Sequence, residues 1–122
     1  MYLYIDTTQK NKTVLEFREM EKPVSRKNIK TDFNQAEKLL KGIDEILNKQ
    51  EIKGEELEKI QVENQGGSFT SLRIGVVTAN ALAYAWGIPV GPEDDSEEVL
   101  QNRGVQVVKP NYSSEPNITT KK

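Results

Sequence analysis

The sequence contains neither cysteine nor histidine in its 122 residues. Without cysteine the chain forms no disulfide and supports no thiolate chemistry, and we expect a protein of the reducing cytoplasm. Without histidine it lacks a principal zinc ligand and the commonest general base, so we expect no catalytic residues, no metal and no cofactor. No apolar run approaches the roughly 18 residues that a membrane span needs, and the start has no signal-peptide pattern.

The charges are nearly balanced, with 17 basic and 19 acidic residues and a formal charge of −2. Hydrophobic residues make up 35% and charged residues 30%, which is typical of a soluble single domain with one modest core. A protein that binds nucleic acid on its own needs a concentrated positive patch, and this composition does not favour one.

The most informative stretch is the run that leads into a helix ending near Trp86. Residues 59–63 alternate as a strand does, and paired glycines follow. Glycine suits a turn whose backbone angles or close contacts exclude a Cβ atom. Ser68 or Thr70 can cap the free N–H groups of the helix, and such a helix start can also hold an anion, although a structural turn is the preferred interpretation. We name this segment the motif loop, with the key residues Gly66, Gly67, Ser68, Phe69, Thr70 and Arg73.

The helix over residues 72–86 is apolar around most of its circumference. At about 100° per residue, Arg73, Asn80 and Tyr84 form one narrow polar stripe. A helix with a single neighbour needs an apolar arc of only about 100°, so we expect a second protein to cover part of this one. Small residues at four-residue spacing let two helices approach closely. We therefore assign the partner interface to Leu72, Gly75, Val76, Ala79, Ala83 and Trp86, with the opposite side on the sheet, although the helical wheel also allows the reverse.

The remaining elements follow from hydrophobic periodicity and turn residues. We expect strands near residues 2–5, 13–20, 23–33, 59–63, 88–90 and 105–108. An amphipathic helix, capped by Asp32 or Asn34, runs to about Lys49. Residues 55–58 and 99–103 are expected to form short helical turns.

These motifs resemble the signature of the bacterial TsaB (YeaZ) family. The matching residues are Gly67-Ser68-Phe69-Thr70, then Leu72-Arg73-Ile74-Gly75, an alanine-rich helix and Gly87-Ile88-Pro89. A first strand that ends in Asp6-Thr7-Thr8 and a final Pro110-Asn111-Tyr112 are similar to the family's two ends. The sequence departs from the family by lacking one proline and one glycine in the motif loop and a histidine before the first long helix.

The resemblance implies an α/β fold, namely a single ribonuclease-H-like lobe of the actin and hexokinase superfamily with helices packed on a mixed five-stranded sheet. Residues 1–92 correspond to the N-terminal lobe, 93–104 to an acidic connector in place of the second lobe, 105–112 to a terminal strand and 113–122 to a disordered tail. In related ATPases the first hairpin holds phosphate and metal. Asp6, Thr7 and Thr8 are therefore candidate vestigial nucleotide contacts, but their turn has no glycine and turn capping by Asp6 is preferred.

The same resemblance implies a non-catalytic dimerisation subunit rather than an enzyme. TsaB proteins pair, through N-terminal-lobe helices, with the related TsaD, which transfers a threonylcarbamoyl group to an adenosine beside the anticodon of certain tRNAs. We expect a heterodimer with a TsaD-like subunit, a TsaE-like ATPase as a further partner, a homodimer when alone, no membrane association, and only indirect contact with tRNA. Two alternatives stay open: a small nucleotide-binding domain of the actin-like ATPase superfamily, and a self-associating protein unrelated to tRNA modification.

Overall fold

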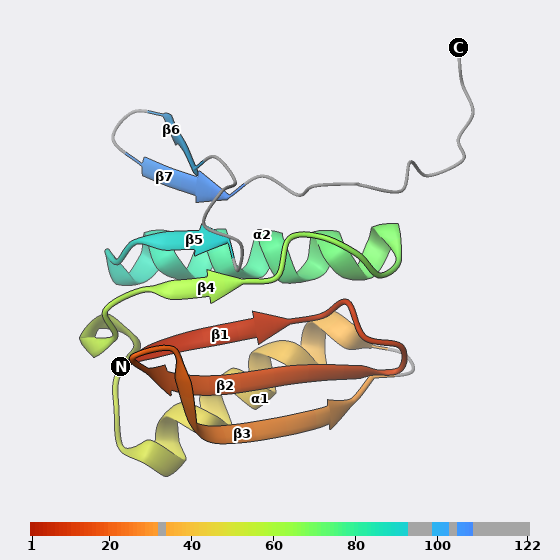
Figure 1. Cartoon of the computed structure of the whole chain (residues 1–122), viewed down its shortest axis with the longest axis horizontal. Coiled ribbons are helices and arrows are strands. Elements are labelled where there is room, and N and C mark those ends of the chain that lie inside the picture. Colours follow the sequence, from red (N-terminus) through yellow and green to blue (C-terminus); the bar gives the residue numbers. More distant parts are fainter. Residues whose placement is uncertain (32–33, 93–98, 103–104, 109–122) are drawn as a thin grey trace.

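The computed structural model describes residues 1–31, 34–92, 99–102 and 105–108 (Figure 1). Its elements are β1 (Tyr2–Asp6), β2 (Lys12–Glu19), β3 (Lys22–Lys30), α1 (Gln35–Gln50), a 3-10 turn (Gly54–Glu56), β4 (Ile60–Val62), α2 (Phe69–Trp86), β5 (Val90–Pro92), β6 (Val99–Asn102) and β7 (Val105–Val108). This order confirms the predicted succession of strands and helices up to β5. The predicted Asp32 cap, the acidic stretch 93–98 and the tail beyond Val108 lie outside the described residues.

Two elements near the end of the chain differ from the prediction. The helical turn predicted for residues 99–103 is wrong, because residues 99–102 form β6, which pairs antiparallel with β7 in a separate two-stranded sheet. A segment of this length is too short for periodicity to distinguish a turn from a strand, and here the pairing decides. The strand expected over residues 88–90 begins only at Val90.

The main sheet has five strands in the order β3-β2-β1-β4-β5. β1 pairs antiparallel with β2, and β2 with β3, through short turns. β1 pairs in parallel with β4, and β4 with β5, through connections that carry helices. The mixed five-stranded sheet with helices packed on it confirms the predicted α/β fold.

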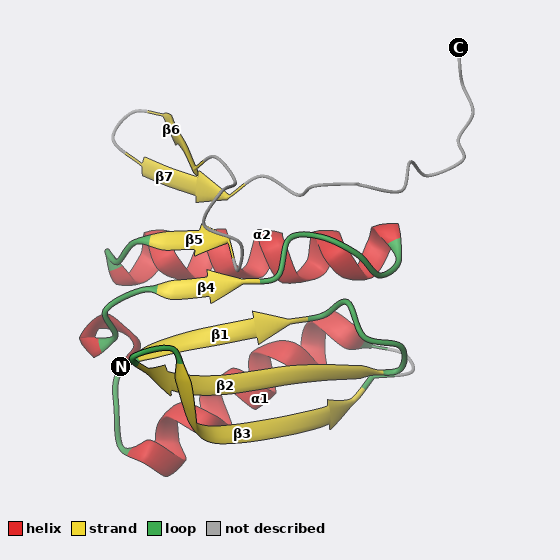
Figure 2. Cartoon of the chain, viewed as in Figure 1, coloured by secondary structure: helices red, strands yellow, loops and turns green. Residues whose placement is uncertain are grey.

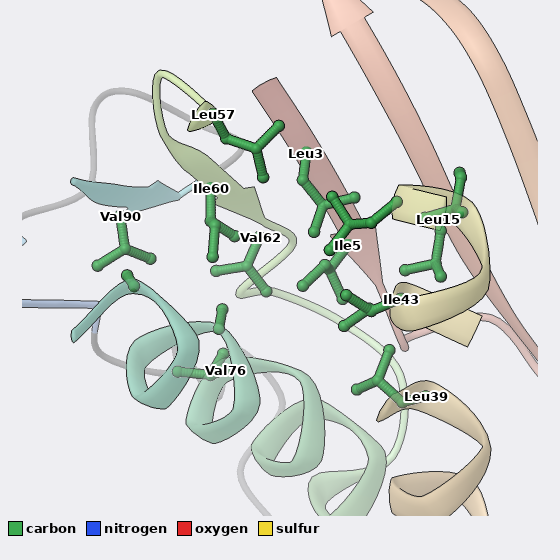
Figure 3. Packing of buried hydrophobic residues seen from close by; sticks show 14 of the residues in the cluster. Leu3, Ile5, Leu15, Leu39, Ile43, Leu57, Ile60, Val62, Val76 and Val90 are labelled. Atoms are coloured by element: carbon green, nitrogen blue, oxygen red, sulfur yellow. The ribbon is translucent and has the colours of Figure 1, made fainter. Parts of the chain in front are cut away.

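Both helices lie on the same face of this sheet, behind the strands in Figures 1 and 2. Alternate strand residues, such as Leu3 and Ile5 of β1, point toward them because successive side chains of a strand lie on opposite faces. Together they form one core (Figure 3), which includes Leu3, Ile5, Leu15, Phe17, Ile60, Val62 and Val90 from the sheet and Leu39, Ile43, Ile46, Leu72, Val76 and Ala79 from the helices. No described helix is long and apolar enough to cross a bilayer.

Two glycines allow close packing around the core. A Cβ atom on Gly42, in the middle of α1, would lie 2.2 Å from Cδ1 of Ile29 on β3. A Cβ atom on Gly54 would lie 2.1 Å from Cε2 of Trp86, so the indole ring packs directly on that backbone. The glycine within α1 therefore weakens the helix locally but brings it against the edge of the sheet.

The opposite side of the sheet, which we call the open face, carries a polar layer. Glu16 is 6% exposed and lies 2.7 Å from Nε of Arg18 and 3.6 Å from Nε of Arg26. The Arg18 guanidinium stacks 3.7 Å above the centre of the Tyr4 ring and donates to Oε1 of Gln61 at 3.2 Å. This layer shields the aromatic rings of β1 where no described helix covers them.

Candidate functional site

The motif loop connects β4 to α2 and begins with two glycines in left-handed conformations. Gly66 has φ 90° and Gly67 has φ 73°, a region that side chains strongly disfavour. Ser68 is the N-cap of α2, and its hydroxyl accepts a hydrogen bond from the Ser71 N–H at 3.0 Å. The structure confirms the predicted glycine turn and selects Ser68, rather than Thr70, as the cap.

The turn after β1 is organised by the carboxylate of Asp6. Its Oδ1 accepts from the N–H and the hydroxyl of Thr8, at 2.8 and 2.5 Å, and its Oδ2 accepts from the side-chain amide of Gln9 at 3.2 Å. Thr7 is fully buried and donates its hydroxyl to the Ser71 carbonyl oxygen at 2.6 Å. Both carboxylate oxygens of Asp6 are thus engaged within the turn, which is the capping role preferred from the sequence.

Glycines hold the motif loop and α2 against this turn. A Cβ atom on Gly75 would lie 2.4 Å from Oγ1 of Thr7, and one on Gly67 would lie 2.7 Å from Cα of Thr8. These distances are far below ordinary contact, so a side chain at either position would force the two segments apart. The glycines of the motif therefore let the motif loop and α2 pack against the turn that follows β1.

A cavity of about 530 Å³ lies between the β1–β2 turn, the start of α1 and the motif loop. Its lining is rich in hydroxyl and amide groups and consists of Thr8, Gln9, Lys10, Asn11, Thr31, Asn34, Gln35, Gly67, Ser68, Thr70, Ser71 and Ile74. Thr31 is 7% exposed, and its hydroxyl has no hydrogen-bond partner among the described residues. The N-cap residue of α1, Asn34, makes no side-chain cap hydrogen bond. Two helix N-termini and one lysine favour a polar or anionic occupant.

The structure brings some of the predicted residues to this cavity and adds others. Thr8, Gly67, Ser68 and Thr70 line it, whereas Asp6, the last residue of β1, is not among the lining residues. Sequence reasoning missed Thr31 and Gln35, because the junction between β3 and α1 meets the motif loop only in the folded chain. The described residues contain no group of three or more histidine, cysteine or acidic side chains that could hold a metal ion.

The structure corrects the assignment of the partner interface. Its residues are buried in the chain's own core, except Trp86, which is half-buried against Gly54; the buried ones are Leu72, Gly75, Val76, Ala79 and Ala83. The small-residue strip therefore packs on the sheet, the reverse orientation that the helical wheel had left open. The exposed side of α2 carries Val77 and Tyr84, which are 57% and 70% exposed. The polar stripe of Arg73 and Tyr84 was the sequence signal for this side, since Val77 lies between them at helical spacing.

Comparison with known families gives a match over residues 30–118, from the end of β3 to a point beyond β7. The matching family model is TsaD, described as tRNA N6-adenosine threonylcarbamoyltransferase. The chain belongs to the TsaD family. The matched region includes the motif loop, α2 and most of the cavity lining. No curated protein matches the sequence.

Two solved structures share the fold of the chain. YeaZ from Pseudomonas aeruginosa has a TM-score of 0.66 and 14% identity over 90% of this chain and 64% of its own. A second Pseudomonas aeruginosa structure, an uncharacterized protein described as similar to the peptidase YeaZ, has a TM-score of 0.67 and 14% identity over 90% of this chain and 63% of its own. The chain thus spans slightly less than two thirds of either structure. The likeness confirms the predicted fold, which the chain shares with YeaZ.

Proposed function

We propose that this chain is a non-catalytic subunit in the formation of threonylcarbamoyladenosine in tRNA, and that it pairs in the cytoplasm with a TsaD-like threonylcarbamoyltransferase. The family match and the YeaZ-like fold support a role in this modification. One observation carries the pairing, namely the apolar side chains that the two helices present to solvent. The absence of histidine and cysteine from the sequence, and the engagement of Asp6 within its turn, support an accessory role rather than a catalytic one.

The proposed contact is an α-layer patch on the outer sides of α1 and α2, made of Leu40, Val77, Ala81, Tyr84 and Ala85. Leu40 is 51% exposed and Val77 is 57% exposed, although both are large apolar side chains. The two helices contact each other on the same face of the sheet, so both can meet a partner at once. Exposed apolar groups gathered on one surface are typical of an interaction site. Two helices from each protein would form a four-helix contact.

The test is co-purification of a tagged chain with the TsaD-like protein from the same genome. Val77→Glu should abolish pairing, because a carboxylate trapped in an apolar interface costs several kcal/mol. The free variant should keep the wild-type circular dichroism spectrum, since Val77 already faces solvent. Val24→Glu is the matched control, because Val24 is 55% exposed on β3, away from the helices. If Val77→Glu paired with the TsaD-like protein as well as Val24→Glu does, the contact would lie elsewhere.

The polar cavity favours a second candidate, a small nucleotide-binding domain. Its lining offers two helix N-termini, Lys10 and the hydroxyl of Thr31, which no described residue engages. Calorimetric titration with magnesium and ATP separates the two functions. The nucleotide-binding domain would be favoured by two results together: ATP binding that disappears in Lys10→Ala, and no pairing of the chain with a TsaD-like protein. A homodimer in gel filtration that a TsaD-like protein does not displace would favour self-association instead.

A further inference from the structure

The open face concentrates positive charge in a way that the nearly balanced composition does not reveal. Register and contacts place five cationic side chains on it, from β2, β3 and the residue before β4: Lys12, Arg18, Arg26, Lys30 and Lys59. Glu16 is the carboxylate among them. Asp6 at the end of β1 and Glu63 just after β4 also lie on this face, at the same end as Lys12 and Lys30, and each accepts hydrogen bonds from its own turn. The part of the face formed by β2 and β3 is therefore strongly positive.

The positive charge on this face is only partly neutralised. Glu16 serves two guanidinium groups, those of Arg18 and Arg26. Lys12 and Lys30 are directly opposite each other in the β2–β3 register, which brings their Cβ atoms to about 5 Å. Like charges in this position repel, and no described carboxylate forms an ion pair with either lysine. A bound polyanion would relieve that repulsion.

The geometry of the face favours contact with phosphates rather than with bases. The rings of Tyr2 and Tyr4 are 4% and 6% exposed, beneath Lys59 and Arg18. They are therefore unavailable to stack on bases. The accessible donors belong to β3, where Arg26 and Lys30 are four positions apart, roughly 13 Å along the strand. A row of cations along an extended strand suits a backbone of repeated negative charges.

We propose that the open face binds the phosphate backbone of RNA without preference for sequence, so that the chain contacts tRNA directly. The charge pattern stands on the structure alone. The choice of RNA rather than an acidic protein rests on the proposed function, because a complex that modifies tRNA must hold that polyanion. The expectation that the chain does not bind nucleic acid on its own came from its composition and net charge, which cannot show how charges are distributed over a surface.

The experiment measures fluorescence anisotropy of a labelled anticodon stem-loop RNA with the full chain alone, over about 50 to 200 mM salt. The open-face variant carries Lys12→Gln, Arg26→Gln and Lys30→Gln. The matched control carries Lys41→Gln, Lys49→Gln and Lys53→Gln, which change the net charge equally on exposed positions of α1 and just beyond it. We expect the logarithmic salt slope to fall by about 0.7 to 0.9 for each phosphate that the open-face variant no longer neutralises, and to stay unchanged in the control.

Three outcomes would overturn the proposal. In the first, the wild-type chain does not bind the RNA up to about 100 µM at the lowest salt. In the second, both triple variants bind the RNA equally weakly. In the third, polyglutamate of equal charge displaces the RNA. The last result would assign the face to an acidic protein. Circular dichroism checks folding, and Lys12→Gln with Lys30→Gln alone serves as a second variant because it leaves the Glu16 contacts intact. The pairing test with Val77→Glu uses no RNA, so failure of the subunit proposal and failure of this one are separable.

Discussion

Gly75→Ala tests whether α2 needs glycine at this position to lie against Thr7. The change should stabilise α2 by about 1 kcal/mol through helix propensity alone. The added Cβ atom would, however, lie 2.4 Å from Oγ1 and 3.0 Å from Cγ2 of Thr7, which is fully buried. Overpacking of this kind costs about 1 to 3 kcal/mol, and breaking the Thr7 hydrogen bond to Ser71 costs about 0.5 to 1.5 kcal/mol more.

The balance is a net destabilisation of about 2 kcal/mol, which for a domain of this size lowers the Tm by roughly 6 to 8 °C. Thermal unfolding followed by circular dichroism measures it. Gly91→Ala is the control, since a Cβ atom there meets nothing within 4 Å, and its Tm should stay close to wild type. Adding Thr7→Ala should recover part of the stability, so that the double mutant is more stable than the sum of the single changes implies. A Gly75→Ala variant as stable as wild type would refute the close approach of α2 to β1.

Two further predictions concern buried contacts. Ala79→Glu should unfold the chain rather than merely prevent pairing, because Ala79 is fully buried and an unpaired buried carboxylate costs several kcal/mol; a folded variant by circular dichroism would contradict its place in the core. Gly54→Ala should displace the indole of Trp86, which packs 2.1 Å from the new Cβ position, and shift the tryptophan fluorescence toward that of a solvent-exposed ring; an unchanged spectrum would contradict that packing.

The sequence predicted most of the backbone but not which way α2 faces. The glycine turn, a cap at Ser68 or Thr70 and a helix end near Trp86 follow from local chemistry. The structure has the turn at Gly66, the cap at Ser68 and the last helical residue at Trp86. The side chains of α2 are apolar nearly all round, so its periodicity does not distinguish the core side from the solvent side. Its small residues could equally accept a second helix or a strand. The contact of Gly75 with Thr7 shows that they accept the end of β1 and the turn that follows it.

The cavity and the open face were harder to predict from the sequence than the fold. The cavity joins Thr8, Thr31 and Ser68, which are far apart in the chain and become neighbours only after the sheet has formed. The open face depends on register: a shift of one residue in β3 would move Arg26 and Lys30 to the helix side. Composition gives the number of charged residues, whereas the positive charge of the open face depends on which side of the sheet each of them points to.

The central position of β1 also has a consequence for synthesis of the chain. Its antiparallel partner β2 follows at once, but Leu3 must wait for Ile60 to complete the parallel side. Until β4 has left the ribosome, the apolar strand Tyr2-Leu3-Tyr4-Ile5 presents an unpaired edge. Such an edge invites pairing with other nascent chains. We therefore expect ribosome-bound chains that stop short of residue 60 to bind chaperones. We expect this binding to end once β4 pairs with β1.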